Sequence, residues 1–366
     1  MTQHRLFFVK LVGLFAVSAF AVTGCGGSNN TADSGTTPTP DLTMTAPPPD
    51  MAVTPPDMAV TPPDMVPQKY SATMLFEEAT VTVPYTTDAG TQSISGKVLV
   101  PIVSVGLAGA KSTHDYDDTN AFHLGCFSDH YDLVNGKKPG KDSNAGTVVM
   151  TGYSTTYKTL GGATVPDEID CVIGASGAYQ CGFGMAMNGM VGPDPATAIF
   201  PPNATLIPPG KAIRFKYAGG MLGTYDSMNA ATATETLAVT EDLTTIKYDA
   251  TKDTTIHFTC PDDPMMAGKC PTGAVLVTLV ASSKNIGEQG YPGTDFGSIN
   301  CVAIASANQI VIKQMAIEKM YGGSNAIKQV YTRVVRGSLP PGGQMDDKGN
   351  GVTLAVGRGV TGFAPR

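Results

Sequence analysis

The residues best suited to chemistry lie in one short stretch of the chain, between His114 and Asp132. Three of the five histidines fall in it, namely His114, His123 and His130. Five aspartates lie among them: Asp115, Asp117, Asp118, Asp129 and Asp132. Imidazole and carboxylate groups together suit Zn²⁺ or a related metal, and carboxylates alone suit Ca²⁺. The candidate metal ligands are therefore His114, His123, His130 and Asp129, and no other cofactor is indicated.

The same stretch has a second interpretation, as a solvated acidic loop whose polar side chains cap turns. Spacings of nine and seven residues between the histidines fit no helix-based metal site, although loops often supply ligands in β-rich proteins. The sequence holds no Gly-x-Ser-x-Gly elbow, no Walker loop and no His-Glu-x-x-His. A Gly-x-Gly-x-x-Gly occurs at Gly357, Gly359 and Gly362, but only four residues follow it, too few for a helix that holds a pyrophosphate. We therefore assign no catalytic residue.

The first residues of the chain combine the parts of an export signal. Arg5 and Lys10 precede an uncharged, mostly apolar run at 11–22, which is too short to span a membrane. The run ends in Val-Thr-Gly-Cys at 22–25, which resembles the lipobox of bacterial lipoproteins. This resemblance implies removal of a signal peptide, residues 1–24, and attachment of palmitate-type acyl chains to Cys25. Gly rather than Asp at position 26 implies onward transport to the outer membrane.

Residues 25–68 then form the lipidated cysteine and a linker of different composition. Residues 26–68 hold ten of the 27 prolines and five aspartates, without any Lys or Arg, and they include the repeat DMAVTPP-DMAVTPP-DM. Pro-Pro in each repeat excludes a coiled coil, and Pro-rich chain prefers extended polyproline II of about 3.1 Å per residue. We expect a disordered tether that reaches on the order of 100 Å. In composition it resembles the linkers of myxobacterial surface lipoproteins.

Six cysteines remain after Cys25, and an even number in an exported chain predicts disulfides. They are Cys126, Cys171, Cys181, Cys260, Cys270 and Cys301. Local closure pairs Cys171 with Cys181 and Cys260 with Cys270, and leaves Cys126 with Cys301. A scheme based on internal repetition instead pairs Cys126 with Cys171, and Cys260 or Cys270 with Cys301. Pro and Gly between Cys260 and Cys270 favour local closure for that pair, and the others stay open.

The cysteines and the candidate ligands at 114–132 must be positioned by short strands separated by turn residues. Segments rich in Val, Ile and Thr predict strands at 79–85, 94–103, 146–152, 169–173, 179–183, 213–217, 235–239, 243–248, 254–259, 274–281, 299–305, 309–312, 328–335 and 352–356. One short helix is predicted over 313–321, stopped by two glycines. The expected fold class is all-β.

An apparent internal duplication refines this expectation. Segments 169–187 and 299–317 align without a gap and share seven of nineteen residues, and 146–152 resembles 273–279. Chance similarity between two simple hairpins is the alternative. A true duplication predicts two related β-sandwich domains of immunoglobulin-like type, at 69–205 and 206–366, after the disordered linker.

Together these features predict a lipid-anchored cell-envelope protein with a non-enzymatic binding or structural role. We expect it at the outer membrane, on the periplasmic face or the cell surface. Its partners are the membrane, through the lipid anchor, and an envelope or extracellular ligand that the sequence does not identify. The net charge of −7 and the lack of a basic stripe exclude nucleic acid. The alternatives are a metal-dependent hydrolase centred on residues 114–132 and a carbohydrate-binding module, which would have to bind sugar without any Trp.

Overall fold

The computed structural model confirms the all-β class. It describes residues 70–87, 90–107, 113–120, 124–142, 144–174, 177–183, 198–208, 211–220, 222–227, 237–261, 270, 273–286, 288, 291–338 and 344–366. Cys25, the tether and the candidate ligand His123 lie outside these residues. The described chain forms strands, the irregular segments that connect them, a 3-10 helix (Ala305–Ala307) and a single α-helix, α1 (Gln314–Tyr321). The glycine at position 322 ends this helix in a left-handed conformation, with φ of 56°.

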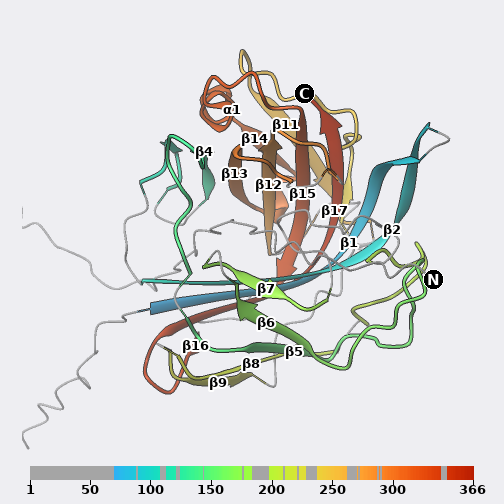
Figure 1. Ribbon diagram of the computed structural model, residues 1–366, viewed down its shortest axis with the longest axis vertical. Helices are drawn as coiled ribbons and strands as arrows, with labels where there is room; N and C mark the ends of the chain where they lie inside the picture. The colour runs from blue at the N-terminus through green and yellow to red at the C-terminus, as the bar shows by residue number, and fades with distance from the viewer. Residues whose placement is uncertain are drawn as a thin grey trace, which may run out of the picture.

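Nine strands of the described chain form one large sheet. Its order is β2 (Gly90–Leu107), β1 (Tyr70–Thr87), β17 (Gly351–Pro365), β15 (Gln329–Ser338), β12 (Ala274–Ser282), β13 (Asp295–Ile304), β4 (Gly125–Asp132) and β3 (Tyr116–Asp117), and β16 (Gln344–Met345) also pairs with β17. Strands β1 and β17 are parallel, and the other neighbours are antiparallel. The first and last strands of the folded region therefore lie side by side (Figure 1).

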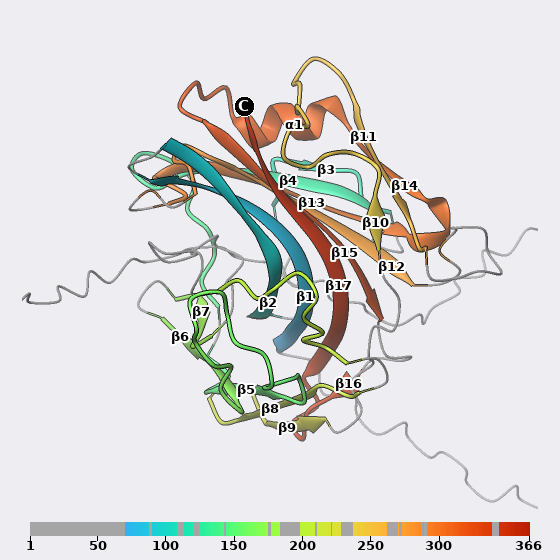
Figure 2. The same ribbon diagram turned by 90° about the vertical axis from the view of Figure 1, so that its right-hand side faces the viewer.

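Two smaller sheets accompany the large one. The first contains, in order, β7 (Tyr179–Cys181), β6 (Ile169–Ile173), β5 (Val148–Thr151), β8 (Arg214–Ala218) and β9 (Thr224–Ser227). The second contains β10 (Ala238–Val239), β11 (Thr254–Thr259) and β14 (Gln309–Ile312). Figure 2 shows β1, β2, β15 and β17 as long curved strands, with the five-stranded sheet near one end of them and the three-stranded sheet with α1 near the other.

The two smaller sheets cover one face of the large sheet, each with its own apolar core. Phe76 of β1 and Phe215 of β8 belong to the core under the five-stranded sheet. Phe258 of β11 and Ile317 of α1 belong to the core under the three-stranded sheet. Alternate residues of a strand share a face, so Val356 in the first core and Val360 against the second lie on the same face of β17. The result is two sandwich-like layers built on one continuous sheet.

A third apolar cluster occupies the opposite face of the large sheet. It includes Val81, Val100, Tyr331 and Phe363, and the rings of the last two lie 4.9 Å apart. Strands β1, β2 and β15 are therefore buried on both faces over much of their length. This explains why the sequence of β2 from residue 98 to 107 reads as a nearly continuous apolar run rather than as a clean alternation.

The expected boundary near residue 205 falls between strands that share sheets. The large sheet combines β1–β4 from before this position with β12, β13 and β15–β17 from after it, and the five-stranded sheet joins β5–β7 to β8 and β9. The repeated segments nevertheless occupy comparable places: β5 pairs with β6, and β12 pairs with β13, both antiparallel. Residues on either side of position 205 thus build two common sheets instead of separate ones.

One predicted strand is wrong. The segment 243–248 forms turns, because Asp242 accepts hydrogen bonds from the backbone N–H of Thr244 at 2.9 Å and from its hydroxyl at 2.7 Å. Such a local side-chain bond competes with strand pairing. The apolar residues of this segment, Leu243 and Tyr248, are still buried in the core beneath α1.

Candidate functional site

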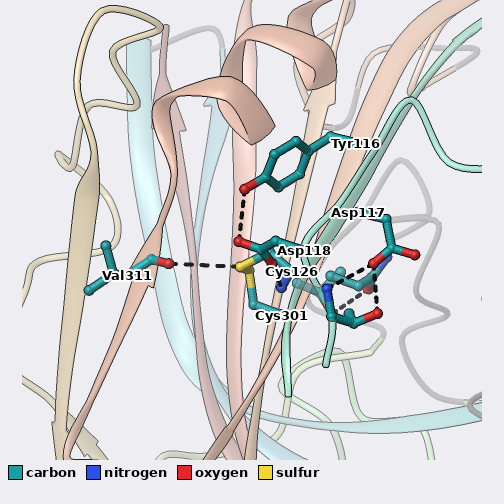
Figure 3. Close-up of a disulfide and its surroundings, with 9 residues drawn as sticks. Tyr116, Asp117, Asp118, Cys126, Cys301 and Val311 are labelled. Carbon is teal, nitrogen blue, oxygen red and sulfur yellow. Dashed lines mark hydrogen bonds between the residues drawn. A yellow bond between two sulfur atoms is a disulfide. The ribbon is translucent and has the colours of Figure 1, made fainter. Parts of the chain in front are cut away.

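The predicted chemical residues lie near one edge of the large sheet, where β4 is held between β13 and β3. Residue pairs fix the register, with Cys126 opposite Cys301 and Tyr116 opposite Ser128. Figure 3 shows that Asp118 turns back toward this disulfide: its carboxylate accepts from the backbone N–H of Cys126 at 2.5 Å and from the hydroxyl of Tyr116 at 2.8 Å. Burial, followed by the bond to Asp118, raises the pKa of Tyr116. Asp118 therefore secures the segment that leads into β4.

Three disulfides are present, and their pairing is that of local closure. Cys171 bonds to Cys181 and Cys260 to Cys270, each ten residues apart, while Cys126 bonds to Cys301 across 175 residues. The scheme based on internal repetition is therefore wrong. Disulfides persist outside the reducing cytosol, so they indicate an extracytoplasmic protein.

His114 and Asp129 form a buried pair. His114 Nδ1 lies 2.8 Å from one carboxylate oxygen of Asp129, and the ammonium group of Lys137 contacts the other. Burial by itself raises the pKa of Asp129, but the bonds from His114 and Lys137 outweigh it and lower the pKa below its ordinary value. The imidazole also stacks on Phe127, with ring centroids 4.1 Å apart. Both oxygens of Asp129 are thus committed to cationic or hydrogen-bonding partners.

His130 belongs to a different pair. Because residues 129 and 130 are consecutive in β4, their side chains point to opposite faces. His130 Nδ1 lies 3.0 Å from the carbonyl oxygen of Met320 at the end of α1, and Nε2 lies 3.1 Å from Asp295 Oδ1. The other oxygen of Asp295 accepts from the hydroxyl of Ser324 at 2.5 Å. His130 therefore fastens the end of α1 to β4 and β13.

The structure does not bring the candidate ligands into one centre. His114 and Asp129 lie together, His130 lies with Asp295, and His123 is outside the described residues. Within the described part of the chain, no group of three His, Cys, Asp or Glu side chains is placed to hold a metal. A His–Asp pair can orient an imidazole as a general base, but the side chain of His114 is only 7% exposed. The pair is better suited to holding the sheet edge closed.

The sequence interpretation missed two buried carboxylates in the middle of β1. Glu77 and Glu78 are adjacent and so face opposite sides of the sheet. Glu77 forms a bidentate ion pair with Arg333. Glu78 contacts the ammonium group of Lys97 at 2.5 Å with one oxygen. A pair of glutamates inside the apolar run MLFEEATV was the available signal, since carboxylates are rarely buried without partners.

The second oxygen of Glu78 fixes a loop that crosses the sheet. It accepts from the backbone N–H groups of Leu206 at 2.7 Å and Ile207 at 2.9 Å. Glu78 thus accepts one charged and two backbone donors, which satisfies a carboxylate held almost entirely away from water.

Two aspartates join distant segments in a similar way. Asp142 accepts from the hydroxyl of Ser104 and the N–H of Val105, both at 3.0 Å, and from the N–H of Tyr179 at 3.2 Å. Burial outweighs these bonds and raises the pKa of Asp142. Asp346 accepts from the N–H of Gly223 at 2.8 Å, which ties the β16–β17 turn to β9. These carboxylates act as structural acceptors.

No protein-family model matches the chain, and no curated protein matches its sequence significantly. Within the described residues, no helix is long and apolar enough to cross a membrane.

Proposed function

We propose that this chain is a lipid-anchored protein of the cell envelope, whose folded region binds a ligand or serves a structural role without catalysis. A location in the cell envelope is supported by the lipobox at Cys25, the Pro-rich tether that follows, and the disulfides of the folded region. Acyl chains on Cys25 would hold it at the outer membrane, since each buried CH₂ contributes about 0.8 kcal/mol to membrane binding.

The observation that carries the non-enzymatic role is the mutual pairing of the reactive groups. Asp129 is bonded to both His114 and Lys137, and His130 lies between a carboxylate and a backbone carbonyl. Groups that work on a substrate keep an open position toward it. Here the contacts of Asp129 and His130 are made to neighbours in the fold.

Metabolic labelling with an alkyne analogue of palmitate tests the anchor in the full-length protein. We expect label in the wild type and in Ser28→Ala, which leaves the lipobox intact, and none in Cys25→Ser. Unlabelled wild type, or label retained in Cys25→Ser, would contradict the anchor.

Metal analysis tests the role of the folded region. We expect the purified full-length protein to bind no stoichiometric zinc, with the same result for His114→Ala and for His257→Ala, a control on the exposed pair with Glu241. Stoichiometric zinc that is lost in His114→Ala but kept in His257→Ala would instead support the hydrolase alternative.

A further inference from the structure

The disulfide between Cys171 and Cys181 differs from the other two in its exposure. Cys171 is fully buried in the core under the five-stranded sheet, whereas Cys181 is only partly buried at the margin of that core. The other four disulfide cysteines are at most 2% exposed. The residue after Cys181 is an exposed glycine, Gly182, which has no side chain to cover the sulfur. Because exposed disulfides exchange most readily, this bond is the best placed of the three to react with an external thiol.

The same bond lies at the edge of a sheet, in a short hairpin. Strand β7 is the edge strand of the five-stranded sheet, and it pairs with β6 over three residue pairs, one of which is Cys171 with Cys181. The bond between Cys126 and Cys301 instead joins β4 to β13, which pair over eight residues and have a further strand on each side. A short edge element opens locally at a lower free energy than strands in the middle of a sheet. Local opening therefore also favours access to the Cys171–Cys181 bond.

Hydrogen bonds on both sides of this disulfide hold the hairpin in register. On one side, the N–H of Gly182 donates to the carbonyl oxygen of Asp170 at 2.8 Å. On the other side, the N–H of Tyr179 donates to the carboxylate of Asp142 at 3.2 Å, and that carboxylate is also bonded to β2. These bonds do not involve sulfur, so they remain when the disulfide is cleaved. The two cysteines then stay opposite each other, and the bond can form again.

We propose that the Cys171–Cys181 disulfide is a reversible thiol-exchange site, whose substrate is an external dithiol that attacks Cys181. A thiolate of the dithiol bonds to Sγ of Cys181, the S–S bond breaks, and Cys171 leaves with the electron pair and takes up a proton. The second thiolate of the dithiol then attacks its own sulfur in the mixed disulfide, which releases Cys181 as a thiol and the reagent as a disulfide. Two electrons pass from the dithiol to the protein. The inference goes beyond the role proposed above and does not depend on the anchor.

Differential alkylation of the full-length, folded protein tests the exchange. Free thiols are first blocked with N-ethylmaleimide, and the protein is then incubated with dithiothreitol. Samples are quenched with iodoacetamide over time, and mass spectrometry measures the alkylation of each cysteine. We expect Cys171 and Cys181 to be alkylated about tenfold faster or more than the cysteines of the other two disulfides, which serve as internal controls. A smaller difference from either of the other pairs would overturn the proposal, as would failure of the bond to form again when oxidised glutathione replaces dithiothreitol.

Two matched variants identify the sulfur that is attacked. Cys171→Ser leaves the thiol of Cys181, and Cys181→Ser leaves that of Cys171. Dithiodipyridine, whose reaction with thiols is followed by absorbance, should react faster with Cys171→Ser, and an equal or opposite order of rates would contradict attack at Cys181. The wild type gives the same information if a variant does not fold, because glutathione, a monothiol, stays on the sulfur that it attacks. Mass spectrometry should find glutathione on Cys181, and glutathione on Cys171 instead would overturn the assignment.

Discussion

Arg333 and Glu77 form an ion pair that spans the strand lying between them. Arg333 Nε donates to Glu77 Oε1 at 2.7 Å, and a second guanidinium nitrogen contacts Oε2. The two residues belong to β15 and β1, on either side of β17, and both are at most 1% exposed. On β17, Gly357 is paired with Glu77 and Thr361 with Arg333, and Gly359 lies between these two positions. A Cβ there would come within 2.7 Å of the carbonyl oxygen of Val334, so the Gly-rich motif allows close strand packing.

Removing the charge of Glu77 should destabilise the fold strongly. In Glu77→Gln the buried guanidinium of Arg333 loses the charge of its paired carboxylate, and we expect a loss of about 3–5 kcal/mol in the free energy of unfolding. Urea denaturation measures it. Asp226→Asn is the control, because the exposed pair with Arg214 should matter far less. Equal effects of the two substitutions would show that burial does not govern the pair.

The Asp129 carboxylate should make the protein sensitive to acid. Its folded-state pKa lies below the unfolded value of about 3.9. The ionised carboxylate therefore contributes to the free energy of unfolding above that pH, and this contribution is lost as the pH falls toward the folded pKa. At neutral pH, Asp129→Asn should cost about 1–3 kcal/mol through the lost charged bonds. The difference in unfolding free energy between wild type and Asp129→Asn should shrink on acidification. Urea titrations at pH 7, 5 and 3 would reveal a constant difference if this is wrong.

Asp142 should behave with the opposite sign. Burial raises its folded-state pKa above the unfolded value, so the native state holds this proton more tightly. Relative to Asp142→Asn, the wild type should therefore gain stability as the pH falls through the folded pKa toward about 3.9. The same urea titrations measure this difference. A wild type that loses stability relative to Asp142→Asn on acidification would contradict the raised pKa.

The long-range disulfide should stabilise the fold more than the local ones. The bond between Cys126 and Cys301 spans 175 residues, and that between Cys171 and Cys181 spans ten. Chain entropy predicts a loss of about 5 kcal/mol on removing the first and about 3 kcal/mol on removing the second. Thermal or urea unfolding of the two Cys→Ala double variants measures the losses. A greater loss for the Cys171–Cys181 variant would show that loop entropy is not the governing factor.

Local sequence patterns predicted much of the secondary structure. Strands 169–173, 254–259 and 309–312 and the helix near 313–321 match β6, β11, β14 and α1, because Val, Ile and Thr runs end at clear turn residues. The long strands were underestimated for a physical reason. Glu77 and Glu78 interrupt the apolar run of β1, and only the distant Arg333 and the nearby Lys97 explain how they are buried. Pairing between the first and last strands leaves no local trace in the sequence.

The contacts of the candidate site also depend on long-range pairing, which local sequence patterns do not reveal. Composition identified the cluster at 114–132, but its side chains are divided by the alternation of β4, which the sequence analysis did not recognise as a strand. The partners of His130 come from Asp295 and Met320, far away in the chain.

The position of β1 also determines how the fold responds to a pulling force. Strand β1 begins at Tyr70, directly after the proposed tether, and it is paired with β2 along its whole length and with β17 from Ser71 to Val81. Tension transmitted from the preceding residues draws β1 along its own axis, while its hydrogen bonds lie across that direction. Bonds loaded in such shear must yield together, whereas a hairpin pulled open from its end loses them one by one. The strand order therefore gives the fold resistance to force at the point where the chain enters it.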